Sequence, residues 1–272
     1  LGSRGLGDVY KRQIYHYMFE IDEVTHKFAR SIDEMTDLKK LYTDNAIMYK
    51  LNAEKVMLIS DTHLECKGTE RLDYFEYVAD FCQRQQIHYL IHGGDITDGT
   101  APKLSKPIYF SPNGNKESRK QMENILKKYP DIPGVTQLVL GGNHDEWYLS
   151  LKDGIDILRV LADYKGIFPL GFTQAFITIC DIPISLEHFD NRNITKGYIP
   201  HDLAIKGHSH EWRVDENNLY LPTLSKRLCH PNTYEGKAGF VIMQPIQTND
   251  GVILHFDRYT FIGANNFLSA SK

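Results

Sequence analysis

The chain has 272 residues, and 31 lysines and arginines against 35 aspartates and glutamates give it a formal net charge of −4. With 42% hydrophobic residues, its composition is that of a globular domain large enough to bury a core without disulfides. The mild acidity argues against a protein that coats nucleic acid non-specifically, although it leaves room for a local basic groove. Apolar runs are no longer than a strand, so we expect no membrane span.

The four cysteines show no CxxC pattern and no paired spacing. This argues against a disulfide framework and against a thiolate zinc site. We therefore expect a reduced, cytoplasmic setting.

The first part of the chain precedes the expected main domain. Residues 3–13 are similar to the in-frame translation of a sequencing-library adapter, so we expect residues 1–13 to be an artefact. Residues 14–55 are polar and mixed in pattern, and we interpret them as an N-terminal extension or the remnant of an upstream domain. Within them, a capping box at residues 31–34 predicts a short helix that ends at about Leu41. The main domain is expected over residues 56–262, followed by a tail at 263–272.

Hydrophobic patterning predicts two different halves in the main domain. Strands and helices alternate in the first half, with strands at 56–60, 89–91 and 137–140 and helices at 70–85, 116–129 and 154–164. Strands dominate the second half, at 175–180, 184–187, 203–206, 219–221, 239–243 and 252–261. A βαβαβ half followed by a β-rich half predicts an α/β fold, a layered β-sandwich flanked by helices.

Polar residues that can bind metal ions stand just beyond the ends of five predicted strands. They are Asp61, His63, Asp95, Asn143, His188, His208 and His210. The carboxyl ends of strands are where open α/β sheets build their sites. Carboxylate, amide and imidazole ligands without a thiolate suit manganese, iron or zinc. Seven such ligands exceed what one tetrahedral ion needs, so we expect two divalent ions sharing one carboxylate. A centre of this kind lowers the pKa of a bridging water and clamps a phosphoryl group, which favours hydrolysis of phosphate esters.

These residues form five blocks that resemble the calcineurin-like metallophosphoesterases. The blocks are Asp61-Thr62-His63, Gly94-Asp95-Ile96-Thr97-Asp98, Gly142-Asn143-His144-Asp145, His188 and Gly207-His208-Ser209-His210. They occur in the family's order between residues 56 and 261, and together they are far more specific than any one of them alone.

The resemblance implies a role for each residue of the blocks. The first metal ion would be held by Asp61, His63 and His210. The second would be held by Asn143, His188 and His208, with Asp95 bridging the two. His144 corresponds to the family's catalytic histidine, which stabilises the transition state or protonates the leaving oxygen, and Asp98 or Asp145 would orient it.

Seven other histidines match no block, and we interpret them as structural or solvated. They are His16, His26, His88, His92, His201, His230 and His255. Trp147 and Trp212 each follow a metal block, and either an aromatic rim for a nucleobase or simple core packing would explain them.

Substrate preference depends on two further features. Residues 100–128 contain seven basic residues against two acidic ones, which indicates either an anion-steering lip or a solvated helix face. Protein phosphatases of this superfamily usually carry an arginine after the second aspartate of the second block and a glutamate in the third block, where this chain has Gly99 and Asp145.

Three functions remain open at this stage. Gly99 and Asp145, which differ from the residues usual in protein phosphatases, favour a phosphodiesterase or nuclease acting on nucleotides or nucleic acid. The alternatives are a phosphomonoesterase, including a protein phosphatase, and a non-catalytic scaffold, which the complete set of ligands disfavours. The sequence leaves the oligomeric state open.

Overall fold

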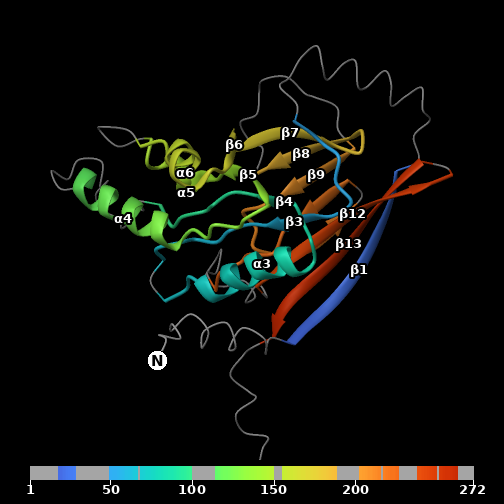
Figure 1. Cartoon of the computed structure of the whole chain (residues 1–272), viewed down its shortest axis with the longest axis horizontal. Helices are drawn as coiled ribbons and strands as arrows, with labels where there is room; N and C mark the ends of the chain where they lie inside the picture. Colours follow the sequence, from blue (N-terminus) through green and yellow to red (C-terminus); the bar gives the residue numbers. More distant parts are fainter. Residues whose placement is uncertain are drawn as a thin grey trace, which may run out of the picture.

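A computed structural model describes most of the chain. Two β-sheets pack face to face, and helices cover the outer face of the larger sheet (Figure 1). This arrangement confirms the predicted α/β sandwich flanked by helices. The described residues are 18–28, 49–66, 68–99, 114–149, 155–188, 202–215, 217–226, 238–249 and 251–262.

The larger sheet has the strand order β1-β13-β12-β3-β4-β5-β6. Its strands are β1 (Met18–Phe28), β3 (Val56–Ile59), β4 (Tyr89–His92), β5 (Thr136–Gly141), β6 (Phe168–Phe172), β12 (Gly239–Thr248) and β13 (Gly251–Ile262). Strands β3 to β6 run parallel, whereas β12 pairs antiparallel with β3, and β13 antiparallel with both β12 and β1. The carboxyl ends of β3, β4 and β5 therefore meet at one edge.

The smaller sheet has the strand order β10-β11-β9-β8-β7-β2. Its strands are β2 (Tyr49–Leu51), β7 (Gln174–Ile179), β8 (Ile182–Glu187), β9 (Leu203–Lys206), β10 (Arg213–Asp215) and β11 (Asn218–Tyr220). Strands β8 and β9 are parallel neighbours, so their carboxyl ends also lie together.

The helices are α3 (Leu72–Arg84), α4 (Gly114–Lys128), the short α5 (Asn143–Glu146) and α6 (Ile157–Lys165).

Two hydrophobic cores hold the layers together. Side chains of β3 alternate between the cores, as expected for a strand covered on both faces. Met57 and Ile59 pack in the core that contains the buried side chains of α3, α4 and α6. Val56 and Leu58 pack in the other core, against β7, β8 and β9 of the smaller sheet.

The predicted elements of the main domain agree with the structure, apart from a few at the edges of the sheets. Strand β6 was not predicted because Pro169 and Gly171 interrupt it, and an edge strand tolerates both residues. Strand β12 extends beyond the predicted end at Met243 through Pro245. A proline fits there because β3 pairs only with residues 241–243 of β12.

Strands β1, β2 and β10 were also not predicted. The first of these pairs along its whole length with β13, so part of the N-terminal segment extends the larger sheet. The helix predicted from the capping box at residues 31–34 lies outside the described residues.

Candidate metal centre

The loops that follow β3 and β4 run side by side at the edge where the strands end. The backbone N–H groups of Asp61, His63 and Leu64 donate to the carbonyl oxygens of residues 94, 95 and 96, at 2.9, 3.1 and 2.9 Å. The parallel pairing of the two strands thus continues into the loops. As a result, the first and second sequence blocks face each other across a hydrogen-bonded seam.

Five of the predicted ligands have a left-handed backbone, which non-glycine residues rarely adopt. Their φ angles are 55° at Asp61, 43° at His63, 52° at Asp95, 73° at His208 and 60° at His210. Such conformations cost roughly 1–3 kcal/mol each and persist where the surrounding structure holds them, which is common at functional sites. Each of the five side chains belongs to a cluster that could hold a metal ion.

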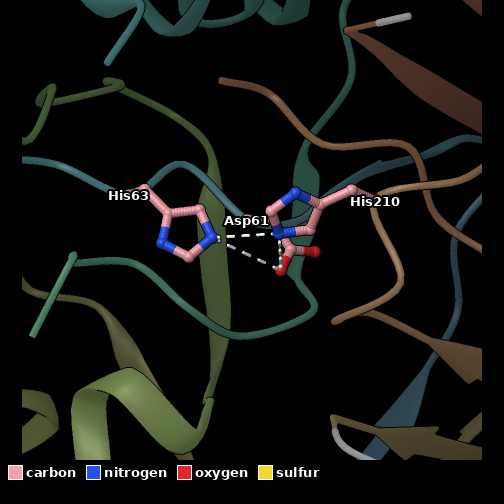
Figure 2. A group of neighbouring side chains, drawn as sticks. All are labelled: Asp61, His63 and His210. Atoms are coloured by element: carbon pink, nitrogen blue, oxygen red, sulfur yellow. Dashed lines mark hydrogen bonds and ion pairs between the residues drawn. The ribbon is translucent and has the colours of Figure 1, made fainter. Parts of the chain in front are cut away.

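Asp61, His63 and His210 form the first group of side chains that could hold a metal ion (Figure 2). Oδ1 of Asp61 lies 3.2 Å from Nε2 of His210 and 3.8 Å from Nε2 of His63. The two Nε2 atoms are 3.1 Å apart. Two imidazole nitrogens that face each other this closely repel unless a proton or a cation lies between them, and the adjacent carboxylate favours a cation.

Asp95, His188 and His208 form the second group, and their ligand atoms all lie within 4.8 Å of one another. Nδ1 of His188 is 2.7 Å from the carbonyl oxygen of Gly93. Because a carbonyl can only accept, Nδ1 carries a proton, and Nε2 is the nitrogen that faces the carboxylate of Asp95, 3.2 Å from its Oδ2. Metal-binding histidines are usually oriented by a hydrogen bond of this kind.

Three glycines make room for the His188 ring. A Cβ atom on Gly94, Gly142 or Gly207 would come within 2.3, 2.6 or 2.6 Å of a ring nitrogen of His188. Any side chain at these positions would displace this imidazole.

Asp95 belongs to both sides of the centre. Its Oδ2 lies 3.2 Å from Nε2 of His188 and 3.8 Å from Nε2 of both His63 and His144. Its Oδ1 accepts from the backbone N–H of His144 at 2.9 Å. This carboxylate therefore lies near members of both groups, as does that of Asp61, whose Oδ1 is 4.0 Å from Nε2 of His188.

Asn143 contributes an amide oxygen that is buried and has no hydrogen-bond partner among the described residues. Leaving a buried acceptor unpaired is unfavourable, and a bound cation would satisfy it. The facing imidazoles, the oriented Nε2 of His188 and this amide oxygen together form an N/O set that fits divalent ions of the manganese, iron or zinc type.

His144 lies beside the ligands with its ring fixed on one side. Its Nδ1 is 2.8 Å from the carbonyl oxygen of Asp98, and its ring packs on Trp147 with the ring centroids 4.1 Å apart. Since the carbonyl can only accept, Nδ1 is protonated, and any proton exchange takes place at Nε2. Burial lowers the pKa of His144, although the nearby carboxylates, Asp95 first, act in the opposite direction.

Asp98 and Asp145 occupy different places relative to His144. The Oδ1 atom of Asp98 lies 3.9 Å from Nδ1 of His144 and 3.8 Å from Nδ1 of His63, so its backbone carbonyl makes the close contact with His144. The carboxylate of Asp145 accepts from the backbone N–H groups of residues 96, 97 and 142 and from the Thr97 hydroxyl, at 2.9–3.0 Å. It ties the third block to the loop of the second.

The charges of the centre act on one another. Burial alone would raise the pKa of Asp61, but neighbouring imidazoles, His210 first, hold it well below its usual range. The pKa of Asp95 is lowered in the same way, mainly by His188. Burial opposes protonation of His188, yet Asp95 and Asp61 outweigh it and raise the pKa of His188 to about 10. In the metal-free protein, a proton on His188 thus supplies the positive charge that these carboxylates favour.

The sequence between residues 54 and 254 matches the family model described as calcineurin-like phosphoesterase. The chain belongs to this family. It is therefore a hydrolase that acts on phosphate esters and depends on metal ions for this reaction.

Two further comparisons concern curated proteins and solved structures similar to this calcineurin-like phosphoesterase. No curated protein matches it. Among solved structures, the nuclease MPE of Pseudomonas putida is similar over 70% of this chain and 84% of its own, with 15% sequence identity and a TM-score of 0.38. That similarity is too weak to bear on the substrate. No helix in the described part of the chain is both long and apolar enough to cross a membrane.

Several features of this phosphoesterase were missed or left open by sequence reasoning. His92, interpreted as structural or solvated, is fully buried next to the metal loops. Trp147 packs on His144, whereas Trp212 packs partly buried against the core between the sheets. Lys128, one of the seven basic residues of the 100–128 segment, forms ion pairs with Glu65 and Glu70, and Lys103 and Lys106 lie outside the described residues.

Proposed function

We propose that this chain hydrolyses phosphodiesters at a centre of two divalent metal ions. The observation that supports two ions is the division of the ligands into two sets with no member in common. One set is Asp61, His63 and His210, and the other is Asp95, His188 and His208. A third set joins Asp95 with His63 and His144, which supports a bridging role for the Asp95 carboxylate.

The ligands would divide as the sequence blocks suggest. The first ion would be held by Asp61, His63 and His210, and the second by Asn143, His188 and His208, with Asp95 shared. When bound, the ions would supply positive charge to the phosphoryl oxygens and a water of lowered pKa for attack.

His144 would act on the leaving oxygen through Nε2. Its Nδ1–H donates to the carbonyl oxygen of Asp98, and Trp147 covers its ring, so its orientation is set before substrate binds. A protonated Nε2 can donate to the oxygen that departs from phosphorus, and an unprotonated one cannot. Asp145 would act indirectly, by holding the His144 loop against the loop of Asp95.

Gly99 supports a preference for diesters. This residue has a φ of +70°, and a Cβ atom there would lie 2.5 Å from the backbone oxygen of His144 and 2.6 Å from the Trp147 ring. An arginine, which protein phosphatases of the superfamily usually carry at this position, therefore does not fit here. A site with one cation fewer suits a diester with a single negative charge better than a monoester dianion.

Helix α4 would extend the site toward a longer polyanion. Nε2 of Gln121 donates to the carbonyl oxygen of Gly99 at 3.2 Å, which places this part of the helix next to the His144 loop. Arg119 and Lys120, immediately before Gln121, are exposed. These exposed cations, on the helix that contacts the His144 loop, could contact phosphates that flank the scissile one.

The proposal is tested by comparing two chromogenic substrates in the presence of manganese. We expect faster hydrolysis of bis-p-nitrophenyl phosphate than of p-nitrophenyl phosphate, together with cleavage of single-stranded DNA, RNA or a cyclic nucleotide. Efficient hydrolysis of a phosphopeptide without cleavage of any of these diesters would favour a monoesterase. Absence of hydrolysis with every substrate would favour a non-catalytic scaffold.

The role of α4 is tested by the salt dependence of single-stranded DNA binding. Each neutralised phosphate contributes about 0.7 to the slope of log K against log salt for a single strand. We expect the double variant Arg119→Ala/Lys120→Ala to flatten this slope by roughly 1 to 1.5 while hydrolysis of bis-p-nitrophenyl phosphate stays unchanged. Lys127→Ala, about two turns further along the same helix, is the matched control and should leave the slope as it is.

A further inference from the structure

Two buried side chains outside the proposed ligand set, His92 and Thr62, connect the two metal loops. His92 is the last residue of β4 and is fully buried, and Thr62 is buried between Asp61 and His63. Nε2 of His92 lies 3.1 Å from Oγ1 of Thr62. This contact adds a side-chain link to the backbone seam between the loops.

The direction of each hydrogen bond in this link follows from the chemistry of its donors. The backbone N–H of Gly94 can only donate, so Nδ1 of His92, at 3.2 Å, is an unprotonated acceptor. A neutral ring then carries its proton on Nε2 and donates it to Thr62 Oγ1. The Thr62 hydroxyl in turn donates to the carbonyl oxygen of Ile96, at 2.8 Å. The chain of hydrogen bonds begins and ends in the backbone on either side of Asp95.

The location of Thr62 gives this link its consequence. Asp61 and His63, on either side of it, both have positive φ angles, a conformation that the surroundings must maintain. The Thr62 side chain anchors the middle of this turn to the loop that carries Asp95. A change in the link would therefore alter the position of two proposed ligands relative to the bridging carboxylate.

We infer that His92 and Thr62 are a positioning pair, in which a neutral, Nε2-protonated His92 sets the distance of the Asp61–His63 turn from Asp95. The inference depends on the proposed function, because it takes these three residues as metal ligands. Burial lowers the pKa of His92 to about 3, which keeps the ring in the neutral form that the link requires.

The pair is tested by measuring manganese affinity in metal-stripped protein together with kcat and KM. Thr62→Val removes the hydroxyl and keeps the shape, and His92→Phe keeps an aromatic ring beside Phe75. We expect each to weaken manganese binding about 10–100-fold and to lower kcat with little effect on KM, as is typical for groups that orient metal ligands. The double variant should be no worse than the more impaired single variant, because both changes break the same link.

Two further variants separate positioning from general damage. Thr62→Ser keeps the hydroxyl and should restore most of the affinity. Thr260→Val is the matched control, because Thr260 is equally buried in β13 but its hydroxyl has no hydrogen-bond partner in the described structure. An equal loss of affinity in Thr260→Val, or additive losses in the double variant, would overturn the inference.

The tautomer of His92 provides a second readout, measured in the wild-type protein. Nitrogen-15 NMR of the metal-free wild-type protein should show His92 protonated at Nε2 only, with His92→Gln used to assign its signals. Protonation at Nδ1 would overturn the inference. Wild-type protein that takes up no metal would overturn both this inference and the proposed function, whereas unchanged manganese affinity in Thr62→Val of an active enzyme would overturn only the positioning role.

Discussion

The Nε2 atoms of His63 and His210 lie 3.1 Å apart, although 147 positions separate these residues in the sequence. His63 follows β3 in the larger sheet, and His210 follows β9 in the smaller sheet. Their meeting point is therefore a junction between the two layers of the sandwich. A cation held there would connect the sheets as well as serve the reaction.

Metal binding should accordingly stabilise the fold. Because an ion that binds only the native state adds RT ln(1 + [L]/Kd), manganese at 100 times its Kd should add about 2.7 kcal/mol per independent site to the free energy of unfolding. Thermal unfolding of metal-stripped protein, with and without manganese, measures this effect. His210→Ala should reduce the shift, whereas His255→Ala, which alters a histidine paired with Asp257 in β13, should retain it. No shift in the wild-type protein would contradict a metal centre at this junction.

Asp95→Asn should release both ions. The carboxylate of Asp95 lies near His63 of the first set and His188 of the second, and an amide cannot share two oxygens between two cations in the same way. Asp61→Asn, a change of the same kind at a ligand of one ion, should remove only the first. Metal analysis of the purified variants distinguishes these results. Full occupancy in Asp95→Asn would contradict the bridging role.

His144→Ala should keep its metal ions and lose most of its activity. The ring is held by Asp98 and Trp147 beside the ligand sets, so its removal changes the transition state more than metal binding. Loss of a general acid typically lowers the rate about 10²–10⁴-fold. Steady-state kinetics and metal analysis on the same preparation measure both effects. A fall in metal content in proportion to activity would instead identify His144 as a ligand.

The clustering of the candidate metal ligands could be predicted from the sequence because the strand ends that carry them converge. Asp61 and Asp95 follow neighbouring parallel strands, and His188 and His208 follow another parallel pair in the second sheet. Any α/β sandwich with this order of elements brings such residues to one edge. Nothing in that argument required knowledge of individual side-chain orientations.

The supporting residues could not be predicted because their roles depend on orientation. His92 looks like any strand histidine until the Gly94 N–H and the Thr62 hydroxyl are seen on its two nitrogens. Asp145 stands next to His144 in the sequence, yet its carboxylate turns toward backbone N–H groups of two loops. Adjacency in a sequence block therefore says little about which neighbour a side chain serves.

The buried histidine His92 should make the metal-free protein less stable in mild acid. Its pKa is about 3 in the folded chain, because burial lowers this pKa more than the nearby charges of Asp61 and Asp95 raise it. His188 lowers it further. An unfolded histidine has a pKa of about 6.5, so below that pH the unfolded chain binds a proton that the native chain does not. This contribution to stability is complete above pH 6.5 and is lost as the pH falls toward 3.

Comparison with His92→Phe isolates this effect from the other titrating groups. The wild-type protein should lose up to about 1.4 kcal/mol of stability per pH unit through His92, and the variant should lose none by this route. We expect His92→Phe to have a lower free energy of unfolding than the wild type at pH 7.5. This deficit in the free energy of unfolding should therefore narrow between pH 6.5 and 4. Denaturant unfolding in excess chelator measures the deficit without a contribution from metal release. A deficit that stays constant or widens on acidification would show that His92 is already protonated in the native protein.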